Sequence, residues 1–256
     1  MQDMILVYGA TGTQGGPIAD QLLTQGRRVR VITRERTRAG HLAARGADVV
    51  VADLGDRDSL AAANEGVDQV VLQLPLQYDF DLHERYGRNA VDAARAAGVE
   101  LVVFNTSAQV VPGTQVHAYQ ARQQVVDYLQ SSGLSNIVLR PTFYMEIFLG
   151  PWIRPGIVEQ SVLAFPLPPN FPMSWVSARE LGAYAVAALR HPGLSGRTFD
   201  IGGPQPLTGE DLAAVFSTRL QRPVATCPSP QTTTSAPSCP CSGPQSPPKS
   251  PRRSAA

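Results

Sequence analysis

Short apolar runs alternate with longer amphipathic segments along the first 140 residues of the chain. Six runs rich in Val, Ile and Leu have the length and composition of buried strands. They span residues 4–8, 28–33, 48–53, 69–74, 100–105 and 136–140. Helical patterns fall between them, most clearly over residues 82–97 and 119–130. This alternation predicts an α/β fold, a doubly wound parallel sheet of the Rossmann type with helices on both faces.

The pattern weakens after residue 140, where several prolines divide the chain into short pieces. A helix is expected over residues 178–190, a strand over 197–201 and a last helix over 208–220, with Thr208 as its N-cap and Asp211 at its third position. We therefore expect a Rossmann-type domain over residues 1–140. A smaller α+β subdomain on the substrate side should occupy residues 141–225.

Residues 226–256 have a different composition, with eight Pro and seven Ser and none of Val, Ile, Leu, Met, Phe, Trp or Tyr. A segment of this kind buries too little apolar surface to offset its chain entropy, so it is predicted to be disordered. Two origins remain open. A GC-rich gene read out of frame gives such a composition, and a genuine flexible tail is the alternative.

Composition excludes several classes of function. The formal net charge of +1 argues against nucleic-acid binding by bulk electrostatics. No apolar run reaches the ~18 residues of a spanning helix, and no leader pattern surrounds the first strand, so we expect a cytoplasmic protein without a membrane anchor. The only Lys is Lys249, and Cys227, Cys239 and Cys241 all follow residue 225. The folded part therefore lacks the groups for Schiff-base, thiol or thiolate–zinc chemistry, and no metal is expected.

A glycine-rich loop connects the first strand to the first helix. It reads Gly9, Ala10, Thr11, Gly12, Thr13, Gln14, Gly15. Gly9 permits a tight turn, Gly12 lets the backbone approach a pyrophosphate, and Gly15 lets the helix pack close to the strand. The spacing G-x-x-G-x-x-G differs from that of ordinary dehydrogenases. In this context the loop predicts a dinucleotide site.

The end of the second strand indicates which dinucleotide is bound. Folds that prefer NAD usually have an acid there, which binds the ribose hydroxyls. This chain has Arg34 instead, with Arg38 one turn further on, and guanidinium groups suit a 2′-phosphate. We therefore expect NADP(H) in preference to NAD(H). Two alternatives stay open: Glu35 could favour NAD(H), or the arginines could belong to a basic loop that contacts only solvent. Asp53 ends the third strand, where it either binds the adenine or caps the following helix.

Several segments together resemble the NmrA-like family, an atypical branch of the short-chain dehydrogenase/reductase superfamily. They are residues 7–16, 31–34, 52–55, 87–94 and 139–146. The resemblance covers residues 4–224, and it implies that Asp53 and Leu54 bind adenine. It also implies that the remaining residues border the ribose and nicotinamide. These are Gln73, Leu74, Pro75, Arg88, Tyr144, Met145, Glu146 and Ile147.

The catalytic residues are less clear. Classical members of the superfamily use Tyr-x-x-x-Lys on one helix, but here Tyr119 is followed four residues later by Gln123. Alignment with relatives puts Arg122 at the lysine position, where it would keep the ribose contact without donating a proton. Ser107 loosely matches the superfamily's substrate-side serine. Tyr119 is either catalytic or an ordinary half-buried helix residue.

Two functions follow from the resemblance. The first, which we favour, is an NADPH-dependent reductase that passes hydride to a quinone, enal or similar small acceptor. The second is a non-catalytic NADP(H) sensor that regulates a protein partner. A nucleotide-sugar epimerase is disfavoured because it would need the Tyr–Lys pair. The sequence leaves open the substrate and whether the chain forms a homodimer or binds a regulatory partner.

Overall fold

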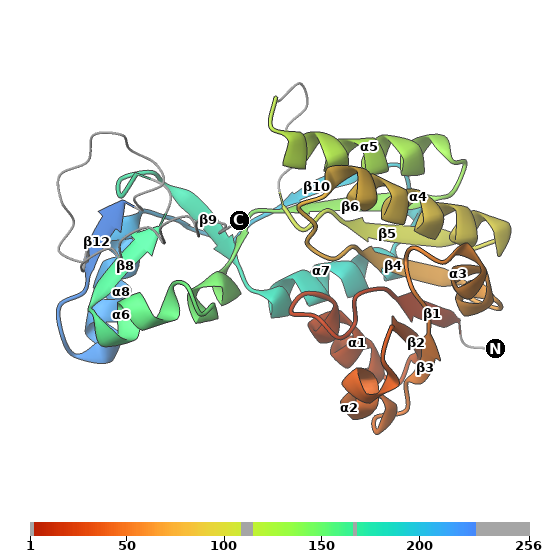
Figure 1. Cartoon of the computed structure of the whole chain (residues 1–256), viewed down its shortest axis with the longest axis horizontal. Helices are drawn as coiled ribbons and strands as arrows, with labels where there is room; N and C mark the ends of the chain where they lie inside the picture. The colour runs from red at the N-terminus through yellow and green to blue at the C-terminus, as the bar shows by residue number, and fades with distance from the viewer. Residues whose placement is uncertain (1–2, 109–114, 166–167, 229–256) are drawn as a thin grey trace, which may run out of the picture. The chain divides into compact units, whose positions relative to one another are not determined.

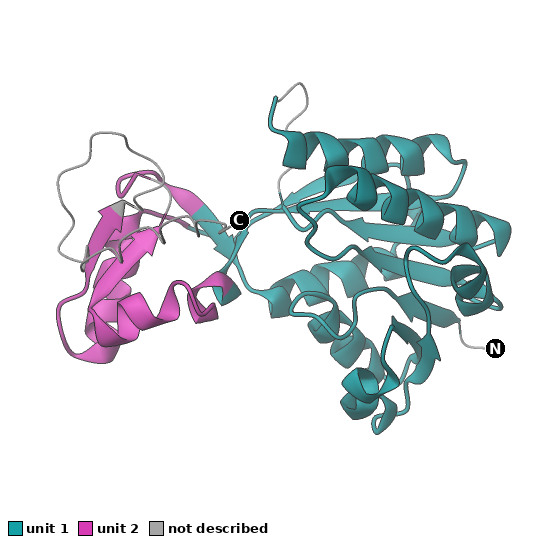
Figure 2. Cartoon of the chain, viewed as in Figure 1, with its two compact units in different colours: residues 1–146, 174–205 teal, residues 147–173, 206–256 magenta. Residues whose placement is uncertain are grey.

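The computed structural model describes residues 3–108, 115–165 and 168–228, and it divides the chain into two compact units (Figure 2). Unit 1 contains Met1–Glu146 and Ser174–Gln205, and unit 2 contains Ile147–Met173 and Pro206–Ala256. The expectations of a disordered or out-of-frame segment over residues 229–256 lie outside the described residues.

Unit 1 is built on a seven-stranded sheet in which every neighbouring pair of strands is parallel (Figure 1). Its order is β10-β6-β5-β4-β1-β2-β3. The strands are β1 (Met4–Val7), β2 (Arg28–Thr33), β3 (Asp48–Val51), β4 (Gln69–Gln73), β5 (Leu101–Asn105), β6 (Asn136–Pro141) and β10 (Thr198–Ile201). The doubly wound α/β prediction is confirmed. The strand order reverses between β1 and β4, and ligands of such sheets bind outside the carboxyl ends at that point.

Helices cover both faces of this sheet because side chains alternate along each strand. In β1, Ile5 and Val7 enter one core, while Leu6 and the following Tyr8 enter the other. Figure 1 shows α4 and α5 on one side of the strands and α1 and α7 on the other. The first core contains residues of α1 (Gly15–Thr24), the η1 turn (Arg36–Ala39), α2 (Gly40–Ala43) and α7 (Ala178–Arg190). The second contains residues of α3 (Arg57–Asn64), α4 (Phe80–Ala96) and α5 (His117–Ser131).

The expected division at residue 140 differs from these units. Strand β10 pairs with β6 and extends the main sheet, and α7 buries Leu181, Ala185 and Leu189 in the core beneath it. In the same unit β7 (Phe143–Tyr144) pairs in parallel with β9 (Met173–Val176), and the short η3 turn (Pro192–Leu194) follows α7. The helix and strand patterns were correct, but they did not show that these elements return to the first sheet.

Unit 2 has its own small apolar core, formed by Ile153, Ile157, Leu163, Ala213 and Val224. Its regular elements are α6 (Arg154–Glu159), β8 (Val162–Phe165), β11 (Pro206–Leu207), α8 (Gly209–Leu220) and β12 (Ala225–Pro228), and the η2 turn (Met145–Leu149) leads into it. The expected cap of α8 is confirmed, since the Thr208 and Asp211 side chains form a capping box.

Strand β12 corrects the expected start of the disordered tail at residue 226. Thr226 and Cys227 pair with Leu163 and Ala164 of β8. A strand is held by its backbone hydrogen bonds, which need no apolar side chain at those positions. The composition of residues 226–228 therefore gave no sign of this pairing.

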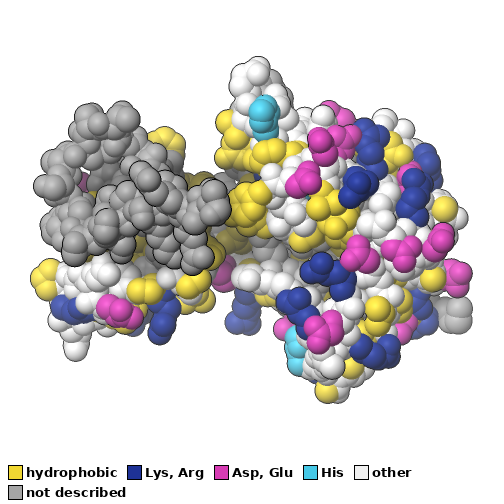
Figure 3. Space-filling model, in the orientation of Figure 1, with side chains coloured by type: hydrophobic (Ala, Val, Ile, Leu, Met, Phe, Trp, Pro, Cys, Tyr) yellow, Lys and Arg dark blue, Asp and Glu magenta, His cyan; other side chains and the backbone are white. Residues whose placement is uncertain are grey.

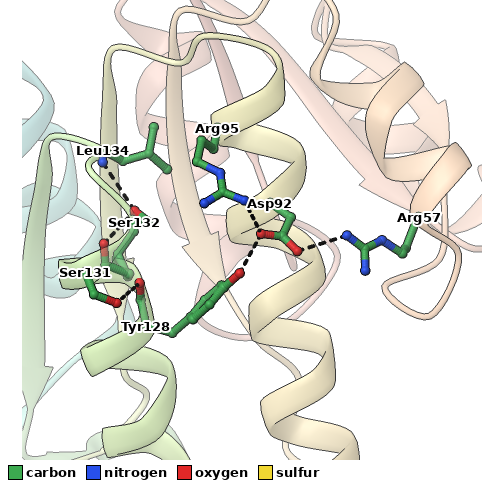
Figure 4. Close-up of polar contacts among 8 residues, drawn as sticks. Arg57, Asp92, Arg95, Tyr128, Ser131, Ser132 and Leu134 are labelled. Carbon is green, nitrogen blue, oxygen red and sulfur yellow. Dashed lines mark hydrogen bonds and ion pairs between the residues drawn. The ribbon is translucent and has the colours of Figure 1, made fainter.

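A polar cluster joins the three helices on one face of the sheet (Figure 4). One carboxylate oxygen of Asp92 on α4 accepts hydrogen bonds from Tyr128 of α5 at 2.6 Å and from Arg95 at 3.1 Å. The other oxygen accepts one from Arg57 of α3 at 3.0 Å. The hydrogen bond to Asp92 raises the pKa of Tyr128. These contacts link α3, α4 and α5, but we expect them to add little stability, because the two arginines are exposed.

The outer surface of unit 1 carries mixed charge. On the face shown in Figure 3, acidic and basic side chains alternate over this unit. Within the described parts of the chain, no helix is both long enough and apolar enough to cross a bilayer.

Gly87 sets the distance between α4 and α5. A Cβ atom at Gly87 would lie 2.5 Å from Cγ2 of Val125, which is fully buried on α5. Gly87→Ala should therefore lower the free energy of unfolding by about 1–2 kcal/mol, since overpacking outweighs the gain in helix propensity. Urea denaturation measures this change. Gly40→Ala is the control, because a Cβ there would meet no neighbouring atom of the described residues within 4 Å. Stability equal to the parent for Gly87→Ala would contradict this packing.

Candidate functional site

A cleft of ≈ 390 Å³ lies at the carboxyl ends of β1, β2, β3 and β4, entirely within unit 1. Most of the predicted cofactor residues line it: Gly9, Thr11, Gly12, Thr13, Gln14, Gly15, Arg34, Arg38, Asp53, Leu54, Gln73, Leu74 and Pro75. The other residues that line the cleft were not predicted from the sequence: Tyr8, Ile32, Thr33, Ala52, Leu76, Gln77 and Tyr86. Six of them lie within two residues of a predicted residue, at the ends of β1 to β4, so their position at a strand end was the available signal. Tyr86 lies on α4.

The glycine loop brings backbone atoms very close together. Gly9 has φ 67°, and the Gly12 N–H donates to the Gly9 carbonyl at 2.9 Å. A Cβ at Gly15 would lie 2.3 Å from that carbonyl oxygen, and one at Gly9 would lie 2.9 Å from the Gln73 carbonyl oxygen. Helix α1 begins at Gly15, so its partially positive amino end lies at the cleft. Ala10 belongs to the loop but is buried beneath it and does not line the cleft.

Two guanidinium groups line the edge of the cleft after β2. Arg34 and Arg38 are exposed, and neither forms an ion pair within the residues that the structure describes. The carboxylate of Glu35 accepts a hydrogen bond from the Thr37 hydroxyl at 2.6 Å. Both cations are thus available to an anionic ligand.

Asp53 does not cap the next helix. Asp56 is the N-cap of α3, where its side chain accepts hydrogen bonds from the Asp58 and Ser59 backbone N–H groups. Asp53 instead accepts from the Gly55 N–H at 2.7 Å, and the Leu54 carbonyl accepts from Asn89 at 2.9 Å. These contacts fix the backbone of the cleft wall where the adenine was expected.

An uncharged hydrogen-bond network joins the loop after β1 to the ends of β4 and β5. The Asn105 amide donates to Oε1 of Gln14 at 2.9 Å and to Oε1 of Gln73. Gln73 donates to the Ser107 hydroxyl at 2.6 Å, and Tyr144 donates to Oδ1 of Asn105 at 3.4 Å. Burial raises the pKa of Tyr144. Asn105 is fully buried, and sequence reasoning assigned it only to a strand.

The structure places Arg88 and Arg122, two of the predicted cofactor residues, outside the lining of this cleft. The Arg88 guanidinium lies 4.3 Å from the centre of the Tyr128 ring and pairs with Glu84 at 2.7 Å. Arg122 donates to the Thr106 carbonyl at 3.1 Å and to the Ala118 carbonyl at 2.6 Å. Burial lowers the pKa of Arg122. Both placements depend on the direction in which the two side chains leave α4 and α5. A sequence alignment gives no information on that direction.

The remaining predicted residues are spread over several places. Tyr119 is partly buried on the first turn of α5 and does not line the cleft. Met145 is 44% exposed, and both carboxylate oxygens of Glu146 accept from the Ala178 N–H at the start of α7. Ile147 belongs to unit 2 and packs against its core. No three His, Cys, Asp or Glu side chains converge on a metal site in the described residues.

His83 is a buried histidine that the sequence analysis did not identify. It is the fourth residue of α4, and its Nε2 atom has no hydrogen-bond partner in the part of the chain that the structure describes. Burial lowers its pKa from 6.5 to about 4, and the nearby charge of Arg122 acts in the same direction, against a hydrogen bond to the Pro75 backbone. His83 is thus a neutral support beneath Pro75, a residue of the cleft wall.

This histidine should make stability depend on pH. Its folded-state pKa lies below the unfolded value, so the unfolded chain binds more protons between pH 6.5 and about 4. The free energy of unfolding should fall by about 2–3 kcal/mol as the pH drops through that window. His83→Gln should remove this part of the pH dependence in urea denaturation. His41→Gln, which changes an exposed histidine, should leave the pH dependence of the free energy of unfolding unchanged. An identical effect of both variants would refute the assignment of this pH dependence to His83.

Similarity to known proteins extends along most of the chain. An NAD(P)H azoreductase of Xenophilus azovorans is 32% identical over 86% of this chain and 75% of its own length. The structure resembles an NADPH-dependent quinone oxidoreductase of Escherichia coli in complex with NADPH, with TM-score 0.77 and 24% identity over 88% of this chain and 78% of that one. It also resembles NmrA, a negative transcriptional regulator, in complex with NADP, with TM-score 0.76 and 19% identity over 90% and 75%. At such identities these structures show the shared fold alone. The azoreductase similarity and a match of the family's sequence model to residues 1–236 confirm the resemblance of the motifs, and the chain belongs to the NmrA-like family.

Proposed function

We propose that this cleft binds NADP(H) and that the chain is an NADPH-dependent reductase, whose hydride acceptor is a quinone, an enal or a similar small molecule. One observation carries the proposal. A loop in which backbone approaches backbone, from Gly9 to Gly15, shares a cleft with the guanidinium groups of Arg34 and Arg38, which form no ion pair among the described residues. The first feature suits a pyrophosphate and the second a 2′-phosphate.

The residues present fit such a cofactor. A Cβ at Gly12 would lie 3.3 Å from the Gly9 carbonyl oxygen, and apart from the chain neighbours no other atom of the described residues lies within 4 Å of it, so the space in that direction is open. The amino end of α1 contributes a favourable potential for phosphate. Asp53 and Leu54 line the part of the cleft after β3, where the adenine edge would meet a carboxylate and a backbone N–H. Gln73 and Leu74, at the end of β4, also line the cleft.

The similar proteins agree with reduction as the reaction. The azoreductase is named for NAD(P)H, and the quinone oxidoreductase structure contains NADPH. Bound NADPH would supply a hydride to the acceptor. A proton must also be added to give the two-electron reduced product, and this chain has no Tyr-x-x-x-Lys pair on α5 to deliver it. Quinone-type acceptors take that proton from water after hydride transfer, which is why we favour them.

A cofactor sensor is the second candidate, and the position of Arg122 favours it. Its guanidinium donates to two backbone carbonyls and does not line the cleft, so it is not positioned by this structure as the free cation that the reductase hypothesis expects. The similar structure of NmrA is that of a transcriptional regulator with NADP. A sensor would bind the cofactor without turnover.

Oxidation of NADPH, followed at 340 nm against a panel of quinones, enals and azo dyes, tests the proposal directly. We expect at least one acceptor to be reduced at a rate well above the protein-free background. Gly12→Val should abolish both turnover and NADPH binding, because its side chain would occupy the space of the pyrophosphate. NADPH binding without any turnover would favour the sensor. Absence of binding would refute both functions.

Cofactor preference is tested at Arg34. Arg34→Ala removes a charged hydrogen bond to the 2′-phosphate, worth about 1.5–3 kcal/mol, and NADH has no such phosphate. The dissociation constant for NADPH should rise by about 10- to 150-fold, with little change for NADH. Arg36→Ala is the matched control, since Arg36 lies in the same loop but does not line the cleft. Equal losses for the two cofactors in Arg34→Ala would contradict the NADP assignment.

A further inference from the structure

The hydrogen bonds around Asn105 form a closed ring. The Ser107 backbone N–H donates to Oδ1 of Asn105 at 3.1 Å, and Nδ2 of Asn105 donates to Oε1 of Gln73. Nε2 of Gln73 then donates to the Ser107 hydroxyl oxygen at 2.6 Å and to the Leu74 carbonyl at 3.0 Å. The ring begins and ends at Ser107, which has φ 63°. Asn105 is fully buried and Gln73 is buried, so their amides depend on these partners to satisfy their hydrogen-bonding groups.

The direction of every bond in the ring is fixed by one group. A backbone N–H can only donate, so the atom of Asn105 that faces Ser107 must be the oxygen. The Tyr144 hydroxyl, at 3.4 Å, contacts the same oxygen. The amide nitrogen of Asn105 must then face both glutamines, and it presents donors to Oε1 of Gln73 and Oε1 of Gln14. Neither glutamine can turn its amide over without placing two donors against each other.

This polarity reaches the cleft through Gln14. Gln14 lies in the glycine loop and lines the cleft, and its Oε1 is occupied by Asn105 at 2.9 Å. Its Nε2 makes no hydrogen bond within the described residues, so two N–H donors remain for a ligand. Gln14 therefore presents a donor, and not an acceptor, at the place where the loop would meet phosphate.

We propose that Asn105 is a positioning residue that sets Gln14 as a hydrogen-bond donor to an anionic oxygen of the bound dinucleotide. The inference rests on the proposed function, because it takes the ligand to be NADP(H). Phosphate oxygens only accept hydrogen bonds, so a reversed Gln14 amide would place a carbonyl oxygen against them. Asn105 thus contributes to ligand recognition from beneath the cleft, without lining it.

A double-mutant cycle with Asn105→Asp and Gln14→Leu tests this role. The aspartate carboxylate has nearly the same shape as the amide but only accepts, so Gln14 must turn its amide and present its oxygen to the cleft. In the parent protein, Gln14→Leu should raise the NADP⁺ dissociation constant about tenfold. In the Asn105→Asp background it should leave the constant unchanged or lower it. Calorimetric titration with NADP⁺ at pH 8 measures all four proteins.

The cycle separates polarity from charge. If the new carboxylate acted only by repelling phosphate, Gln14→Leu would cost the same factor in both backgrounds, and that result overturns the proposal. Should Asn105→Asp fail to fold, Asn105→Ser serves as the uncharged background. Its hydroxyl is too short to hold Gln14, so the effect of Gln14→Leu should shrink there, and an undiminished effect overturns the proposal equally.

Two further controls complete the experiment. Asn136→Asp places the same carboxylate at another buried asparagine, 5% exposed, at the amino end of β6 and so at the opposite edge of the sheet. It should leave the NADP⁺ dissociation constant unchanged, and a rise equal to that of Asn105→Asp overturns the proposal. NADP⁺ binding by the parent protein is read in the same titrations. Failure of the parent to bind would refute the proposed function, whereas parent binding with an additive cycle refutes only the role of Asn105.

Discussion

The close approach of Gly15 to the Gly9 carbonyl is the constraint on which the candidate site depends. A Cβ at Gly15 would lie 2.3 Å from that oxygen, so only glycine lets α1 begin directly against the turn that ends β1. The same turn touches the end of β4, where a Cβ at Gly9 would lie 2.9 Å from the Gln73 carbonyl oxygen. The turn thus lies at the carboxyl ends of β1 and β4, the two strands between which the strand order reverses, and its residues line the cleft.

Burial determines the hydrogen-bond partners and the protonation states of the polar groups near this cleft. Gln73 and Asn105 are buried, so their amides bond to each other and to fixed neighbours, and their orientation becomes a property of the fold. His83 is buried nearby under Pro75 and is neutral because a charged imidazole would be desolvated. Arg122 holds the Thr106 carbonyl at the end of β5. The charged groups that line the cleft, Arg34, Arg38 and Asp53, come instead from the ends of β2 and β3.

Unit 1 is completed by elements from the second half of the chain. The β10 strand adds an edge to the sheet beside β6, and α7 fills the core under β1 with Leu181 and Leu189. The Glu146 carboxylate accepts from the first N–H of α7. This hydrogen bond links the last residue of the first part of unit 1 to the helix of its second part. Unit 2 therefore consists of two stretches of chain, an insertion between two parts of unit 1 and the segment that follows residue 205. The strands of the seven-stranded sheet come from both parts of unit 1.

Local pattern determined the strands of the seven-stranded sheet, the two clearest helices of unit 1, the cap at Thr208 and the chemistry of the loop from Gly9 to Gly15, because each depends on residues close in sequence. Arg34 and Arg38 also follow from position, since parallel strands place their carboxyl ends at one edge. Tertiary structure alone decided the rest. Asn105 meets Gln73 across 32 residues and Gln14 across 91, while Arg88 turns to Tyr128 and Arg122 to backbone carbonyls. Those partners depend on strand order and helix rotation, and the local pattern of apolar and polar residues carries neither.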